Sequence, residues 1–215
     1  MPRICYIILS CAPLLKTRVK WQRSSWLQHV PADSYRILTG AIKSTEPNVV
    51  CTSVGDNYES CPRRYYEYIR NNDLLEYDWI FFVDDDTFVF PKRLEDYLAS
   101  MNPDELIYTG RALNWPIHFM SGGAGFGLSK ETYRSLRAYL IDAPTVGFHK
   151  NGDTTMGMWI GHIPNVVFKN SRLLNGSIAT HGDSSPISEA ITYHYVTEEL
   201  FKEYGKHLTV PKEDL

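Results

Sequence analysis

Short apolar runs alternate along the chain with amphipathic stretches, and this alternation predicts the secondary structure. Each run is bounded by Gly, Pro, Asp or Ser, which is typical of buried parallel strands. We expect strands at Ile4–Leu9, Tyr35–Leu38, Val49–Thr52 and Trp79–Val83.

Helices are expected between and after these strands, where apolar residues recur at helical spacing. The clearest case is Pro91–Met101, in which Leu94 and Leu98 share one face and the proline suits the first helical position. Further helices are expected at Lys16–Leu27, at Cys61–Asn71 and after Ser129. Strand–helix alternation predicts an α/β fold with a mostly parallel central sheet and helices on both sides. Ligands of such sheets bind outside the carboxyl ends of the strands.

The last third of the chain has weaker periodicity. Residues 141–152 and 164–190 are rich in Gly, Ser, Asn and Pro, and we expect them to be loops. Long loops in a compact domain are often functional, so this region is expected to form an acceptor-binding rim. Because no repeat or low-complexity linker interrupts the chain, residues 1–215 are expected to form a single domain, alone or as one module of a longer polypeptide.

Composition narrows the classes of partner. The 215 residues include 22 Lys and Arg against 25 Asp and Glu, a net charge of −3, which argues against nucleic acid as the main partner. The apolar run Ile4–Leu9 is too short to span a bilayer and lacks a signal-peptide cleavage pattern. We therefore expect no membrane span and a cytoplasmic location. The four cysteines lack metal-ligand spacing and are expected to be free buried thiols.

The most specific local pattern is the acidic triplet Asp84–Asp86, directly after the fourth apolar run. Three adjacent carboxylates repel one another, and burial adds to the cost, so a compensating positive group is expected. A divalent cation is the simplest candidate, because hard cations prefer carboxylate oxygen. One alternative is that the triplet caps the next helix, although Pro91 begins that helix several residues later. Another is a phosphatase of the haloacid dehalogenase type, whose Asp-x-Asp-x-Thr/Val motif is matched except at Phe88.

The second pattern is the glycine-rich segment Ser121–Ser129, which contains four glycines. Glycine lets the backbone approach a ligand closely. The segment matches neither the dinucleotide fingerprint nor the P-loop. Two interpretations therefore stand side by side: the wall of a ligand site, or a tight bend between two buried strands.

An acid and two histidines follow. Asp153 precedes an apolar helical pattern and is expected to cap that helix; a carboxylate held there would also suit a catalytic base. His194 lies in an alternating, strand-like run, so its side chain would face one defined side. An imidazole would complement a carboxylate on Mn²⁺. The sequence leaves open whether His194 or His181 is the metal ligand.

Together these residues resemble the fringe and core-1 β-1,3-galactosyltransferase group of inverting GT-A glycosyltransferases. The resemblance spans roughly residues 78–200, with a weaker early match at Arg18–Trp26. Its motifs are an aspartate-rich strand with the following helix at 78–94, a glycine-rich donor segment at 120–131, Asp153–Gly157, and the His-containing segment Ile191–Val196. The resemblance implies a GT-A fold and metal-dependent transfer of a sugar from a UDP-sugar to a hydroxyl of a glycan or glycoprotein, by single displacement.

The resemblance also implies residue roles. Asp86 and His194 would hold Mn²⁺, with Asp84 as a further ligand and Mg²⁺ as the alternative metal. Asp153 would deprotonate the acceptor hydroxyl. Nucleotide-sugar contacts are expected from Asp84, Asp85, Ser10, Cys11, Arg18, Thr52, Ser53, Asp56, Gly122 and Gly123. Weaker candidates for acceptor contacts are Trp115, Trp159 and His181, with core packing as the alternative for the two tryptophans.

The chain departs from this group in lacking the signal-anchor helix and the cysteine pattern of Golgi members, and in its short length. This predicts a soluble relative of a bacterial or large-DNA-virus type, placed in the host cytoplasm if viral. Two functions from other classes stand as alternatives. One is a metal-dependent phosphohydrolase that uses the Asp triplet. The other is a non-catalytic sugar-binding module, against which the intact Asp153 argues.

Overall fold

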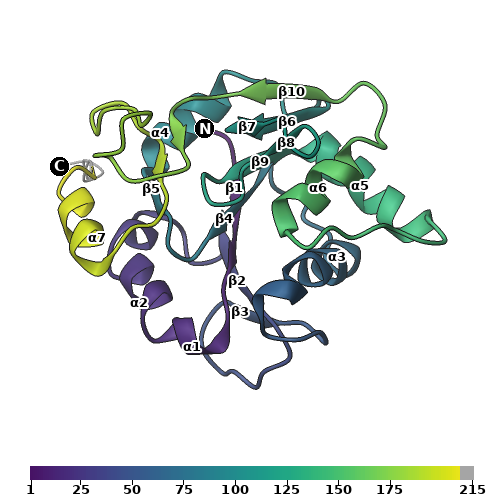
Figure 1. Ribbon diagram of the computed structural model, residues 1–215, viewed down its shortest axis with the longest axis horizontal. Coiled ribbons are helices and arrows are strands. Elements are labelled where there is room, and N and C mark those ends of the chain that lie inside the picture. The colour runs from purple at the N-terminus through teal and green to yellow at the C-terminus, as the bar shows by residue number, and fades with distance from the viewer. Residues whose placement is uncertain (209–215) are drawn as a thin grey trace.

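The computed structural model describes residues 1–208, which surround a seven-stranded sheet (Figure 1). The strand order is β10–β6–β9–β4–β1–β2–β3. The strands are β1 Ile4–Leu9, β2 Tyr35–Thr39, β3 Val49–Cys51, β4 Trp79–Asp84, β6 Ile107–Gly110, β9 Phe126–Ser129 and β10 Val167–Asn170. Neighbours pair in parallel except at β9, which is antiparallel to both β4 and β6. The expected mostly parallel α/β fold is therefore confirmed.

The strands at the centre of the sheet end together on one edge. β1 matches the expected strand residue for residue, and β4 runs one residue further than expected, to Asp84. Their parallel register places Leu9 beside Asp84. The segments that follow β1 and β4 therefore begin at the same level of the carboxyl edge, where ligands of such sheets bind.

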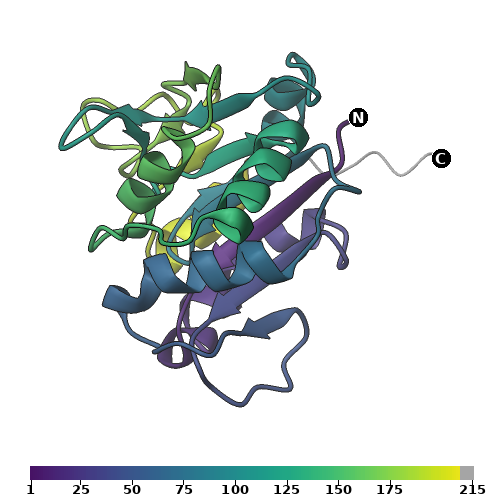
Figure 2. The same ribbon diagram turned by 90° about the vertical axis from the view of Figure 1, so that its right-hand side faces the viewer.

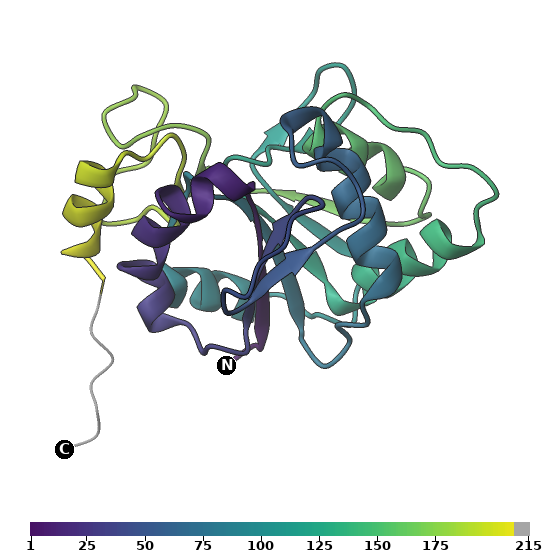
Figure 3. The same cartoon turned by 90° about the horizontal axis from the view of Figure 1, so that it is seen from below.

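Helices cover both faces of the sheet. One face carries α3 Cys61–Asn71, α5 Lys130–Asp142 and α6 Gly152–Ile160, which lie in front of the sheet in Figure 2. The other carries α1 Ala12–Leu15, α2 Arg18–Arg23, the 3₁₀ helix η1 Trp26–His29, α4 Pro91–Ala99 and α7 Glu198–Gly205. Figure 3 shows the two groups on opposite sides of the sheet.

Side chains of the central strands alternate between two apolar cores, because successive strand residues point to opposite faces. Ile7 and Phe82 belong to the core beneath α3, α5 and α6. Ile8 and Phe81 belong to the core beneath α2, α4 and α7. This two-sided burial explains why β1 and β4 read as continuous apolar runs rather than as alternating ones.

Two of the expected helices are confirmed and a third is slightly shorter. Helix α3 spans exactly Cys61–Asn71. Helix α5 begins after Ser129, whose hydroxyl accepts a hydrogen bond from the Thr132 N–H at 3.2 Å and so caps the helix. Helix α4 begins at Pro91 as expected and ends at Ala99.

The single helix expected at Lys16–Leu27 is wrong. Between Ala12 and His29 the chain forms three short helices, α1, α2 and η1, which are separated at Thr17 and Ser25, whose backbone angles are not helical. The hydroxyls of Ser24 and Ser25 both donate to the Trp21 carbonyl, at 3.0 and 2.7 Å. Such local bonds compete with the helical ladder.

The loops expected at 141–152 and 164–190 are only partly right. Helix α5 continues to Asp142, and α6 begins at Gly152. The second stretch contains β10, the outermost strand of the main sheet, and β11 Leu174–Asn175. Within residues 1–208, β10 pairs with β6 alone, and its Val167 is half exposed. An edge strand of this kind forms because it pairs with its neighbour and not because both of its faces are buried. Its apolar sequence pattern is therefore weak.

A smaller sheet, β11–β12–β5, brings the last part of the chain back to the end of β4. β12 Thr192–Tyr193 runs antiparallel to β5 Phe88–Val89, with Tyr193 beside Phe88. His194 therefore follows β12 next to the acidic triplet. A hairpin of β7 Ala112–Leu113 and β8 Phe119–Met120 leads into the glycine-rich segment.

Two remaining expectations concern the membrane and the cysteines. Within residues 1–208, none of the helices combines the length and the apolar composition needed to cross a bilayer. All four cysteines are free thiols, but only Cys5 and Cys61 are buried, and Cys51 is exposed.

Candidate active site

The acidic triplet occupies the turn between β4 and β5. Asp84 is the last residue of β4, and its side chain is one third exposed, whereas those of Asp85 and Asp86 are 5% and 10% exposed. The Gln22 side-chain amide donates to the carbonyls of Asp84 and Thr87, at 3.0 and 3.1 Å. These two bonds fix the backbone of the turn from α2.

Side chains from other segments at this edge of the sheet contribute a positive charge and a hydrogen bond to the acidic triplet. Arg18, at the start of α2, places Nη1 3.1 Å from Asp85 Oδ1 and 3.1 Å from Asp86 Oδ2. The Ser10 hydroxyl, directly after β1, donates to Asp85 Oδ2 at 2.7 Å. The triplet is therefore compensated in part by the protein itself. It does not cap the next helix, whose N-cap position is Phe90.

His194 completes a cluster with two of the acids. Its Nε2 lies 3.1 Å from Asp86 Oδ1 and 3.9 Å from Asp84 Oδ2. One ligand atom from each of these three residues lies within 4.8 Å of the others. Two carboxylates and an imidazole suit a borderline divalent cation such as Mn²⁺. Of the two histidines that the sequence left open, the structure places His194 in this cluster.

The charged groups in the cluster shift one another's pKa values. Burial, together with Asp86 and Asp85, raises the pKa of Asp84 to about 7, against the opposing effect of His194. Burial also raises the pKa of Asp85. Burial opposes the charged form of Asp86, but the hydrogen bond and charge of His194 outweigh it and lower the pKa of Asp86. Burial similarly disfavours the imidazolium, yet Asp86 raises the pKa of His194. The four groups thus share a surplus of negative charge, which a cation would neutralise.

The glycine-rich segment forms the wall beside this cluster. It turns between β8 and β9, with Gly125 in the left-handed region at φ +81°. A Cβ added to Gly123 would overlap the imidazole of His194. The Thr87 hydroxyl donates to the Gly123 carbonyl at 2.7 Å, which ties the wall to the acidic turn. The segment is therefore both a tight bend between strands and a close lining of the cluster.

Asp153 stands on the far side of the glycine turn. Its Oδ2 accepts a hydrogen bond from the Gly122 N–H at 3.0 Å, and its Oδ1 accepts one from the Thr154 N–H at 2.7 Å. The expectation that Asp153 caps α6 is corrected: α6 begins at Gly152, its N-cap is Asn151, and Asp153 lies within the first turn. The two backbone donors still hold the carboxylate in a fixed orientation.

Two cavities meet at the cluster. The first, of about 340 Å³, is lined by the acidic triplet together with Ser10, Cys11, Arg18 and Arg64. The second, of about 420 Å³, is lined by Gly123, Asp153 and His181, among others. Asp84, His194, Tyr58 and Tyr195 line both cavities. Two of the three candidate metal ligands, Asp84 and His194, therefore line both cavities, and Asp86 lines the first.

Four residues predicted to contact the nucleotide-sugar line neither cavity: Thr52, Ser53, Asp56 and Gly122. The Thr52 hydroxyl is buried and donates to the Thr39 carbonyl at 2.9 Å. Ser53 bonds Glu67 through its N–H and its hydroxyl, each at 2.6 Å. The Asp56 carboxylate accepts from the N–H groups of Ala12 and Gly40, at 2.6 and 2.8 Å. These contacts fix the loops behind the first cavity.

The aromatic candidates for acceptor contacts are also placed differently from expectation. Trp159 is a core residue: it is buried, and its indole N–H donates to the Gly147 carbonyl at 2.9 Å. This corrects its assignment as a stacking platform for a sugar. Trp115 is 85% exposed and lines neither cavity.

The cavity residues that sequence reasoning missed include Arg64, Tyr58 and Tyr195. Arg64 is buried in α3, where its guanidinium donates to the carbonyls of Ser10 and Asn57. A charged residue within the apolar stripe of α3 was the sign that could have found it. Tyr195 directly follows His194 within the segment Ile191–Val196, and this adjacency was the sign that could have found it. Tyr58 is an exposed aromatic residue without a distinctive pattern around it, and only the folded chain brings it to the cluster.

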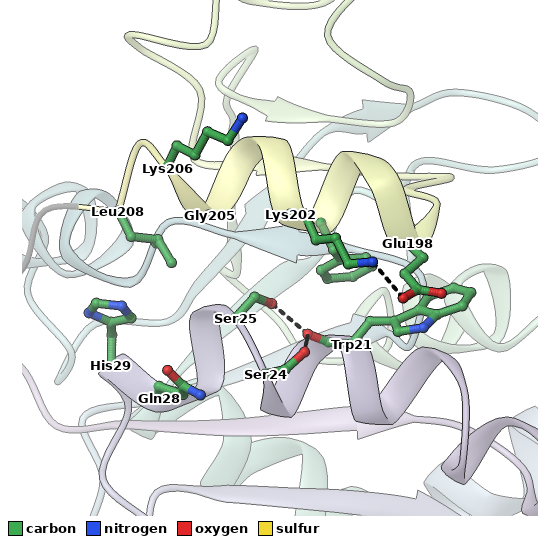
Figure 4. Close-up of a pocket in the computed structure, with 11 residues that line it drawn as sticks. Trp21, Ser24, Ser25, Gln28, His29, Glu198, Lys202, Gly205, Lys206 and Leu208 are labelled. Carbon is green, nitrogen blue, oxygen red and sulfur yellow. Dashed lines mark hydrogen bonds and ion pairs between the residues drawn. The ribbon is translucent and has the colours of Figure 1, made fainter.

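A third cavity, of about 380 Å³, lies between α2 and α7 (Figure 4). Its lining shares no residue with the other two. Lys202 pairs with Glu198 at 2.8 Å, and Ser24 and Ser25 bond the Trp21 carbonyl. Four of its polar side chains are thus engaged within the protein, and none of the candidate site residues lines this cavity.

Comparisons with known proteins show the family of the chain and the proteins that share its fold. A family model described as Fringe-like matches residues 6–182. A glycoprotein-N-acetylgalactosamine 3-beta-galactosyltransferase 1 of Xenopus laevis is 26% identical over 197 residues, covering 89% of this chain and half of that protein. The chain thus spans about half the length of the curated relative it matches.

Solved structures show that the fold is shared with glycosyltransferases. A glycosyltransferase involved in glycosylation of the major capsid of PBCV-1 superposes with a TM-score of 0.52 at 14% identity, covering 95% of this chain and all of that chain. The glycosyltransferase GlyE of Streptococcus pneumoniae gives a TM-score of 0.55 at 10% identity, covering 95% of this chain and 60% of that chain.

Proposed function

The chain belongs to the Fringe-like family, and on that premise we propose that it transfers a sugar from a UDP-sugar to a hydroxyl of a glycan or glycoprotein. The observation that carries the proposal is that one cavity is lined by Asp84 and His194 of the cluster and also by Asp153. Sugar transfer needs a leaving group and an acceptor hydroxyl within one site. A candidate cation site and a candidate base that share a cavity support that chemistry.

The donor set fits Mn²⁺, with Mg²⁺ as the alternative. Asp86 and His194 would hold the ion, with Asp84 as a further ligand. A bound cation supplies neutralisation of the charge that develops on a departing diphosphate. The rest of the chain keeps the ligands converged: Arg18 orients Asp86 from one side, and Gly123 leaves room for the imidazole.

The nucleoside diphosphate is assigned to the first cavity and the donor sugar to the second. Ser10, Cys11 and Arg18 line the first cavity beside the triplet. The Arg18 side chain is 39% exposed, so Arg18 can present positive charge to a ligand entering there. The sugar would then follow the glycine wall at Gly122 and Gly123 towards Asp153.

Asp153 is assigned as the base. Two backbone N–H groups orient its carboxylate, and the first turn of α6 favours its negative charge. In a single displacement, the acceptor oxygen bonds to the anomeric carbon as the bond from that carbon to the diphosphate breaks. The hydroxyl proton passes to Asp153. Attack opposite the leaving group inverts the anomeric centre, so no covalent sugar–enzyme intermediate is needed.

A screen of nucleotide-sugars tests this proposal. With Mn²⁺ present, one or more UDP-sugars are expected to raise the thermal midpoint and to be slowly hydrolysed, because ligands that bind only the folded state stabilise it. Chelation of the metal should abolish both effects. UDP affinity that does not depend on metal in titration calorimetry would contradict the metal assignment. Phosphate release from an aryl phosphate without UDP-sugar turnover would support a phosphohydrolase instead.

A further inference from the structure

Tyr195 has an unusual backbone for an exposed aromatic residue. Its φ is +59°, in the left-handed region, and its side chain is 63% exposed. Among the described residues, the other non-glycine positions with positive φ are Asn48 and Asn165. Asparagine tolerates this region because its short side chain bonds locally, whereas a bulky residue there is strained. A strained residue persists when the surrounding structure holds it, and such residues cluster at functional sites.

The strain coincides with a contact to the cluster. The Tyr195 ring stacks on the His194 imidazole, with centroids 3.7 Å apart and planes at 29°. In an extended strand, neighbouring side chains point to opposite faces and cannot stack. β12 ends at Tyr193, and the left-handed turn at Tyr195 brings the two rings to the same side.

Two further contacts fix the segment around this stack. The Val196 N–H donates to the Asp86 carbonyl at 2.9 Å, so the residue after Tyr195 is tied to the acidic turn. The backbone of Gly123 lies so close to the imidazole that a Cβ there would overlap it. Because one face of a ring cannot accommodate both the glycine and a ring 3.7 Å away, the imidazole lies between them.

We propose that Tyr195 is a positioning residue, whose ring holds His194 Nε2 towards Asp86 and Asp84 and so prepares the cation site. This inference rests on the metal site of the proposed function. Tyr195 acts through His194 and not by ligating the ion itself. Exposure of the ring means that it adds little to the apolar core, so its strained backbone is maintained for the site and not for the fold.

Three variants separate positioning from a structural role. Tyr195→Phe keeps the ring and is expected to preserve Mn²⁺ affinity, measured by titration calorimetry in the presence of UDP. Tyr195→Gly removes both the ring and the strain, so its thermal midpoint should equal or exceed that of the parent. Its Mn²⁺ affinity should nevertheless fall by about 10–100-fold, as is typical when a group that orients a metal ligand is lost. Asn165→Gly is the matched control: it relaxes a left-handed backbone away from the site and should leave Mn²⁺ affinity unchanged.

The outcomes distinguish this inference from the proposed function. Parental Mn²⁺ affinity in Tyr195→Gly, or equal losses in Tyr195→Phe and Tyr195→Gly, would overturn the positioning role. His194→Ala serves as the reference and should weaken Mn²⁺ at least as much as Tyr195→Gly. If His194→Ala binds Mn²⁺ like the parent, the metal site itself is wrong, and the positioning role fails with it.

Discussion

The two halves of the candidate site are built in different ways. The acidic half follows β4, whose Trp79–Val83 are at most 1% exposed and which is hydrogen-bonded on both sides at the centre of the sheet. The other half consists of Gly123, Asp153 and His194, which lie outside the main sheet on segments far apart in sequence. A few contacts place that half, such as the bond from Gly122 N–H to Asp153 and the stack of Tyr195 on His194.

This difference predicts how substitutions act. The strand half is held by the fold, so changing its side chains alters charge while leaving the backbone in place. The connecting half is held by individual contacts, so small changes there alter geometry. Substitutions in each half therefore test whether the strand half responds through charge and the connecting half through geometry.

Asp153→Asn should have the largest effect on transfer. The amide keeps an oxygen that can accept from Gly122 N–H, but it cannot take up the acceptor proton. Loss of a positioned base typically costs about 10²–10⁴-fold in rate, so transfer should fall by that factor. Binding of UDP with Mn²⁺, measured by calorimetry, should remain unchanged. Asp142→Asn, at the exposed end of α5, is the control. Parallel loss of binding and transfer would contradict the assignment of the base.

Gly123→Ala tests the geometry of the connecting half. The added methyl would overlap the His194 imidazole and push it from the cluster. We expect Mn²⁺ affinity to fall by about 10–100-fold, comparable to the loss of an orienting contact. Gly205→Ala, where a Cβ would meet nothing within 4 Å, is the matched control. Undiminished Mn²⁺ binding in Gly123→Ala would mean that the imidazole is free to move and that the wall does not hold it.

Arg18→Gln tests the strand half and should have the smallest effect. It removes two ion pairs to nearly buried carboxylates, but Arg18 itself is 39% exposed, so water screens the pairs. We expect the free energy of unfolding to fall by about 1 kcal/mol. Added Mn²⁺ should restore part of that loss, because it neutralises the same acids. Urea unfolding with and without Mn²⁺ measures both effects.

Lys92→Gln is the control for this experiment, since Lys92 and Asp96 form an ion pair with both side chains more than half exposed. Such pairs contribute little to stability because water screens them, and this one should not respond to Mn²⁺. Equal responses of the two variants to Mn²⁺ would show that Arg18 does not share its acids with a cation.

The central framework of this protein follows from local sequence patterns. Continuous apolar runs predicted β1 and β4 almost to the residue, because strands buried on both faces allow little else. The adjacency of three carboxylates at the end of β4 predicted a compensated acidic cluster, because like charges packed together need opposite charge nearby.

The way in which segments distant in sequence meet depends on tertiary contacts. β10 is a strand only through its pairing with β6. Ser53 bonds Glu67, Trp159 packs in the core, and Tyr195 stacks on His194, although no local pattern separates these outcomes from their alternatives. Local sequence fixes periodicity and turn chemistry, whereas the choice of partner depends on which surfaces the sheet and its connections bring together. His194 and Asp153 flank the glycine turn for that reason. The small sheet places His194 there, and the first turn of α6 places Asp153 there.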